Sequence, residues 1–120
     1  MDSAGAGEWR GGLSQRIEIA NREKAPFAIS AATFDRIKNP AKGRDGGGVG
    51  VKGVARLGSG KALPDKGIHV IPTGDSLVVE LPGGGGFGDP KLRSRELVEA
   101  DVNAGLVSKE AAKYDYFFSR

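Results

Sequence analysis

Residues 82–90, which read Pro-Gly-Gly-Gly-Gly-Phe-Gly-Asp-Pro, constrain the fold of this 120-residue sequence more than any other stretch. Four consecutive glycines lose more backbone entropy on ordering than other residues would, so a folded chain keeps them where φ is positive or where another segment packs very close. A strand-like pattern over 76–81 leads into the run and a helical pattern follows it. Two prolines and a phenylalanine argue against a flexible linker. We therefore predict an ordered corner of the fold.

The glycine run formally contains the spacing GxGxxG, through Gly83, Gly85 and Gly88, but it lacks the setting of a nucleotide site. Asp89 precedes a proline, which disfavours helical backbone at Asp89, so the next helix begins too late to offer its N-terminus to a phosphate. No βαβ unit surrounds the run, and no Gly-Lys-Ser/Thr follows it. The sequence predicts no nucleotide site here.

The composition indicates one small domain with a thin core. Glycine supplies 20 of the 120 residues, and Leu, Ile, Val and Phe together supply less than a quarter, close to the ~20% below which chains tend to be disordered. The chain has no cysteine, so disulfides and thiolate metal ligands are excluded. Its one histidine, His69, lies in an apolar stretch where a strand role is expected rather than a metal role. We hypothesise that a partner completes the fold.

The charge pattern does not favour nucleic acid or a membrane. The net charge is +3 and the pI is about 9.3, but basic residues are scattered and alternate with acidic ones. This pattern is typical of a solvated surface rather than of a basic stripe. No stretch approaches the ~20 apolar residues of a membrane span, and no apolar leader opens the chain. We expect a cytoplasmic protein.

The remaining patterns predict an α+β fold, in which short strands are linked by irregular Gly/Pro-rich segments and followed by two short C-terminal helices. Polar–apolar alternation and short apolar runs predict strands at 16–19, 27–30, 54–57, 67–71 and 76–81. The glycine-, lysine- and proline-rich residues 38–53 predict extended, polyproline-like backbone with close neighbours. We divide the chain into a glycine-rich β module, 1–92, and a helical pair, 93–120, which form one structural unit.

The two C-terminal helices have clear start and stop signals. Ser94 and Ser108 stand at N-cap positions, each followed by a glutamate in the first helical turn. Gly105 ends the first helix. The apolar stripe of this pair consists of Leu97, Val98, Val102 and Leu106, with Glu99 and Asp101 on the other face.

Three aromatic residues, Tyr116, Phe117 and Phe118, lie close to the end of the sequence. Side chains of this kind seldom stay in water, so we expect them to dock on another surface. A DNA-reading helix-turn-helix is a weaker interpretation of this region, because the second helix is short, alanine-rich and carries acidic residues.

Several stretches together resemble the C-terminal end of the hydantoinase B family, which includes N-methylhydantoinase B, the matching half of 5-oxoprolinase, and subunits of acetone and acetophenone carboxylases. The stretches that carry the resemblance are Pro82–Pro90, Arg95–Val98, Asp101–Val102, Gly105–Ser108, Glu110–Ala112 and Tyr114, with Gly5–Leu13 resembling the family's glycine-arginine-glycine stretch. Two departures are the Ser94-Arg95 pair, where the family often has Asp-Pro, and the absence of the large N-terminal portion. Since the chain begins with its own Met1, we expect it to be a tail module encoded as a separate small subunit.

The resemblance implies a place in an ATP-dependent complex. Enzymes of this family use ATP to phosphorylate an amide or enol oxygen, then hydrolyse a ring or carboxylate a ketone, without biotin. We accordingly expect larger hydantoinase A-like and hydantoinase B-like partner subunits, with ATP and Mg²⁺ bound in the partners and no cofactor in this chain.

The arrangement resembles most the acetophenone carboxylase complex, so the expected function is a non-catalytic small subunit of a ketone carboxylase. A subunit or fragment of an ATP-dependent hydantoinase or oxoprolinase is the alternative. A small basic nucleic-acid-binding module is the third interpretation, and it predicts strong salt-dependent binding.

The residues themselves contain no convincing nucleophile–base pair, so no catalytic, cofactor-binding or metal-binding residue is expected. Arg10 and Arg44, each beside glycines, are candidate contacts for an anion such as hydrogencarbonate or phosphate, with a surface or interchain ion pair as the alternative. The glycines are expected to interleave with a partner's backbone and the aromatics to anchor it. The expected structural or interface residues are Gly83, Gly84, Gly85, Gly86, Phe87, Asp89, Tyr116, Phe117 and Phe118.

Overall fold

The computed structural model describes residues 1–31 and 34–119, and it has the α+β architecture that the sequence predicts. The elements are β1 (Arg16–Ala20), β2 (Phe27–Ser30), β3 (Val54–Leu57), β4 (Ile68–Ile71), β5 (Ser76–Glu80), the 3₁₀ turn η2 (Pro90–Leu92), α1 (Arg95–Asn103) and α2 (Lys109–Asp115). All five predicted strands and both predicted helices are confirmed to within a few residues.

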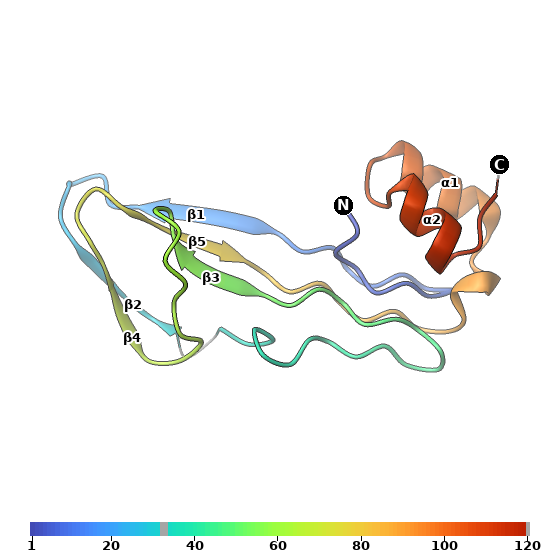
Figure 1. Cartoon of the computed structure of the whole chain (residues 1–120), viewed down its shortest axis with the longest axis horizontal. Coiled ribbons are helices and arrows are strands. Elements are labelled where there is room, and N and C mark those ends of the chain that lie inside the picture. The colour runs from blue at the N-terminus through green and yellow to red at the C-terminus, as the bar shows by residue number, and fades with distance from the viewer. Residues whose placement is uncertain (32–33, 120) are drawn as a thin grey trace.

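The molecule is elongated. Strands gather at one end, the helices at the other, and long extended segments join the two (Figure 1). The principal extents are 52 × 26 × 17 Å and the radius of gyration is 17.2 Å, against about 14 Å for a compact domain of this length. This shape leaves a large share of the chain at the surface.

Two small antiparallel sheets form the strand end. One has the order β1-β5-β3, and the other pairs β2 with β4. In the first sheet, Leu77 lies opposite both Ile19 and Leu57, so the apolar positions of the three strands share one face. A core of Leu57, Ile71 and Leu77 lies between the sheets. The strand end is therefore held together by a hydrophobic core, which the alternating apolar residues of the strands supply.

Glycine-rich segments over 3–14, 41–53 and 82–88, here called the glycine bundle, run side by side through the middle of the molecule (Figure 1). Val51 N donates to Ser3 O (3.0 Å), and three residues away Gly48 N donates to Ala6 O (2.6 Å). The same step of three separates Gly83 N to Val51 O from Gly86 N to Gly48 O, both 2.9 Å. A repeat of three matches polyproline II helix, not a β-ladder. The polyproline-like prediction for this backbone is confirmed.

Close backbone approach explains the glycines. A methyl group on Gly83 would overlap the carbonyl oxygen of Ser3, and one on Gly50 would overlap that of Gly83. The sequence analysis predicts that a partner's backbone lies against these glycines. The structure instead places other segments of the same chain there.

The helical pair begins and ends where the sequence predicts. The Ser94 and Ser108 hydroxyls accept hydrogen bonds from the backbone N–H groups of Leu97 (3.3 Å) and Ala111 (3.0 Å), and Gly105 has φ +69°. A second core consists of Val98, Val107, Ala112 and Tyr116. Within the described residues, no helix has the length and hydrophobicity needed to cross a bilayer.

The predicted apolar stripe on α1 is wrong at two positions. Leu97 is 45% exposed, whereas Asp101, expected on the outer face, is 7% exposed. The buried face of α1 is centred on Val98 and Asp101. This rotation brings Asp101 against two arginines from outside the helix, as described below.

Candidate interaction site

Trp9, Phe87 and Arg44 form a side-by-side row where three segments of the glycine bundle meet, here called the tip row. Trp9 and Phe87 exchange two backbone hydrogen bonds, both 2.9 Å. On the other side of Phe87, Arg44 N donates to Gly86 O (2.9 Å) and Gly88 N donates to Arg44 O (3.0 Å). Residues that lie directly opposite each other on neighbouring extended segments direct their side chains to the same face, so the three side chains point the same way.

The tip row is exposed although its backbone is firmly held. Trp9 is 62% exposed and Phe87 46% exposed, and Arg44 is also exposed. Backbone hydrogen bonds and a tightly packed glycine, Gly7, fix the row: a methyl on Gly7 would lie 2.7 Å from the backbone of both Trp9 and Phe87. Trp and Arg dominate the energetic centres of protein interfaces. The tip row is therefore an exposed surface whose backbone is held in one arrangement.

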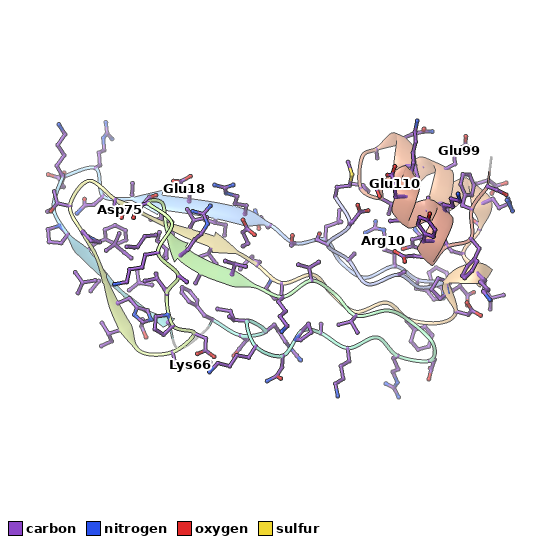
Figure 2. All side chains as sticks on the ribbon, viewed as in Figure 1. Arg10, Glu18, Lys66, Asp75, Glu99 and Glu110 are labelled. Carbon is purple, nitrogen blue, oxygen red and sulfur yellow. The ribbon has the colours of Figure 1, made fainter. Side chains whose placement is uncertain are left out.

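A buried ion cluster ties the glycine bundle to the helical pair. Arg10 Nε lies 3.1 Å from Asp101 Oδ2, and Arg93 Nη2 lies 3.0 Å from the same oxygen. The Arg93 guanidinium also donates to Glu8 O (3.0 Å), while its Nε is buried without a hydrogen-bond partner. Figure 2 shows Arg10 beside the helices. Arg10 forms an ion pair, as in the second interpretation, but the pair is largely buried and lies within this chain rather than at the surface or between chains.

The start of the chain contacts the same helices. Asp2 N donates to Leu106 O (3.0 Å), and Ser108 N donates to a carboxylate oxygen of Asp2 (2.7 Å). Ala6 packs against the helical core. The ion cluster and these contacts hold the helices against the bundle.

The three terminal aromatics have different environments. Tyr116 is buried within the helical core, and this burial raises its pKa, partly opposed by Arg93 and Arg10. Phe118 is partly buried against the same core. Phe117 is 60% exposed, with Lys91 Nζ 4.5 Å from its ring centroid. Of the three side chains, Phe117 is the most exposed and is therefore the one most accessible to a partner.

The structure places the other expected residues inside the scaffold. Gly83–Gly86 form part of the bundle, and Asp89 caps η2 by accepting a hydrogen bond from Lys91 N (2.9 Å). His69 lies in β4 as predicted, with Nε2 2.9 Å from Pro64 O. Among the residues that the structure describes, no group of three His, Cys, Asp or Glu side chains could hold a metal.

Trp9, Arg93 and Asp101 were not among the site residues expected from the sequence. Trp9 had a signal, because it is the only tryptophan and lies within the glycine-rich Gly5–Leu13 stretch. Arg93 and Asp101 had no such signal, since the sequence does not show that Arg10, 91 residues from Asp101, joins them.

With this geometry established, comparison with known proteins identifies the family. The model of the Hydantoinase B/oxoprolinase family matches residues 1–90, which contain the whole tip row. The chain belongs to the Hydantoinase B/oxoprolinase family. This membership agrees with the resemblance carried by the glycine run.

Relatives match beyond residue 90 as well. The chain is 34% identical over 130 residues to the beta subunit of the caprolactamase from Pseudomonas jessenii, covering 96% of this chain and 21% of that one. It is 31% identical over 125 residues to the B-type chain of a putative D-/L-hydantoinase from a Pseudomonas species, covering 96% and 20%. A crystal structure of the ATP-dependent caprolactamase from Pseudomonas jessenii superposes with a TM-score of 0.72 at 26% identity, covering 97% and 21%. The chain thus spans about one fifth of the length of these relatives.

Proposed function

We propose that this chain is a structural segment of a hydantoinase B-type subunit in an ATP-dependent complex that hydrolyses cyclic amides. Its role is to present the tip row, on a rigid glycine scaffold, to a larger subunit. The observation that carries this proposal is the rigid, exposed alignment of Trp9, Phe87 and Arg44. An exposed aromatic pair next to a guanidinium has the composition of an interface centre rather than of a free surface.

Burial across the chain supports a role in assembly. In the described residues, large apolar side chains that are exposed outnumber those that are buried. A self-sufficient domain of this size would bury more of them, although scattered exposed apolar residues are ordinary. Besides the tip row, the exposed set is Met1, Ile17, Ile19, Val49, Val51, Val54, Ile68, Val70, Leu81, Leu92, Leu97, Tyr114 and Phe117.

The relatives' names support the type of reaction. A caprolactamase and a hydantoinase are named for a lactam and a hydantoin, which are both cyclic amides. Cyclic-amide hydrolysis therefore has more support than ketone carboxylation, and the acetophenone carboxylase-like small subunit stays a prediction. On this proposal, ATP and Mg²⁺ bind in a hydantoinase A-type partner, and this chain contributes no catalytic group.

The test is a chimera in which this chain replaces the matching fifth of the beta subunit of Pseudomonas jessenii caprolactamase. We expect the chimera to assemble with its larger partner and to hydrolyse caprolactam with ATP. In the same chimera, Trp9→Ala with Arg44→Glu is expected to weaken assembly at least ~100-fold, because interface centres of this kind contribute ~2 kcal/mol or more each. Size-exclusion chromatography and product analysis measure the two effects.

Tyr114→Ala is the matched control, since Tyr114 is 69% exposed but lies outside the tip row. Full assembly of the Trp9/Arg44 variant would refute the assigned role of the tip row. Carboxylation of acetophenone by the natural complex, purified from its own cells, would replace the proposed reaction with the carboxylase.

A further inference from the structure

The open edge of β1 is the feature that the proposed function does not use. β1 is an outer strand of the sheet β1-β5-β3, and in Figure 1 none of the segments that the structure describes lies along its outer side. All five of its residues are exposed. The opposite edge of this sheet is covered, because Leu57 N donates to Lys61 O (2.8 Å) and Leu63 N donates to Ala55 O (2.9 Å). The sheet therefore has one covered edge and one open edge.

The hydrogen-bonding groups at this open edge can be assigned. Leu81 N donates to Gln15 O (2.8 Å), so Gln15 directs its backbone toward β5. Backbone groups alternate in direction along an antiparallel strand, so Arg16, Glu18 and Ala20 direct theirs toward the open side. An edge of this kind is a template for another strand.

The charges of β1 match those of a second copy in one antiparallel register. A two-fold axis at Ile17 places each Arg16 opposite the other copy's Glu18 and brings the two Ile17 side chains together. An axis at Arg16 or Glu18 would place like charges opposite each other, which is destabilising. An axis at Ile19 or Ala20 would extend the pairing into the loop that follows the strand.

A further feature agrees with this register. Ile17 and Ile19, 37% and 47% exposed, lie on the sheet face that also carries Leu77, so an apolar face would continue from one copy into the next.

We propose that two copies of this chain pair antiparallel through β1, centred on Ile17, to form one continuous six-stranded sheet. Charged edge strands commonly keep sheets apart. Here the charges attract in the one register that also satisfies the backbone groups and joins the apolar face.

Sedimentation equilibrium of the whole chain tests this pairing. We expect a concentration-dependent dimer, and at least ~10-fold weaker dimerisation for Arg16→Glu or Glu18→Arg alone, because each change turns two opposite-charge pairs into like-charge pairs. The double variant R16E/E18R is expected to recover dimerisation. An equimolar mixture of the two single variants is expected to form a heterodimer.

Lys61→Glu, a charge reversal beside the covered edge, is the matched control and is expected to leave the dimer unchanged. Circular dichroism of every variant separates misfolding from loss of pairing. A chain that stays monomeric would overturn the proposal and leave this edge to the remainder of a hydantoinase B-type polypeptide. Failure of the double variant to recover dimerisation while folded would likewise overturn it.

Discussion

The glycine bundle and the helical pair achieve stability in opposite ways. The bundle has few large side chains inside it, and its segments are joined by backbone hydrogen bonds at intervals of three residues. The helical pair is capped by serines and packs a small side-chain core of Val98, Val107, Ala112 and Tyr116. The bundle is therefore sensitive to any added Cβ atom, whereas the helices are sensitive to lost side-chain contacts.

This difference explains how so glycine-rich a chain can be ordered. Glycine is costly to order because of its backbone entropy, but only glycine lets three segments approach to hydrogen-bonding distance in this arrangement. The same rigid backbone holds Trp9 and Phe87 in place without burying them. The surface to which we assign the proposed function therefore lies on the bundle.

The largest expected effect is on the bundle. Gly83→Ala places a methyl group on the carbonyl oxygen of Ser3, which is backbone and cannot rotate away. We expect the free energy of unfolding in urea, followed by Trp9 fluorescence, to fall by more than about 3 kcal/mol. Gly12→Ala is the control: nothing lies within 4 Å of its added methyl, so a change within about 0.5 kcal/mol is expected. Equal effects at the two glycines would contradict the close-packed bundle.

The second effect concerns the ion cluster that joins the two regions. Asp101→Asn keeps the shape of the side chain but leaves Arg10 and Arg93 without their carboxylate. We expect a loss of about 2 kcal/mol in the free energy of unfolding. Glu110→Gln, an exposed neutralisation on α2, is expected to cost less than about 0.5 kcal/mol. If both variants unfold alike in urea, the cluster does not contribute to holding the regions together.

The third effect tests the caps of the helical pair. Ser108→Ala removes the hydroxyl that accepts from Ala111 N at 3.0 Å, with an expected cost of about 1 kcal/mol. Ser94→Ala removes a longer bond, 3.3 Å to Leu97 N, and is expected to cost about half as much. Thermal unfolding of the two variants compares them directly. A larger loss at Ser94 would reverse this ranking.

The smallest effect is a pH dependence. Burial raises the pKa of Tyr116 above the ordinary 10.0, so the unfolded chain loses this proton first as the pH rises. The contribution of Tyr116 to the free energy of unfolding is therefore fully present below about pH 10 and is lost as the pH rises above it. We expect Tyr116→Phe to reduce the alkaline loss of stability, measured by urea unfolding between about pH 9 and about pH 11. Tyr114→Phe, at a 69% exposed position, is the control, and an equal change there would remove Tyr116 as the cause.

Local sequence signals were sufficient for the elements. Alternation located the strands, serines and Gly105 located the helix ends, and the glycine-rich composition of 38–53 indicated polyproline-like backbone. The candidate site was recovered less completely. Phe87 and Arg44 were singled out because they adjoin glycines, but nothing local indicated that Trp9 would lie directly opposite Phe87.

The sequence by itself determined what each segment becomes, because capping, alternation and glycine content act over a few residues. Only the tertiary structure decided which segments meet. The glycines at 83–86 lie against Ser3–Ala6 and Gly48–Val51, and Asp101 faces Arg10 across 91 residues of chain. Backbone hydrogen-bonding groups are the same for every residue except proline, so composition does not show which segments of the glycine bundle pair with each other. These pairings follow from the approach distances that the folded chain allows.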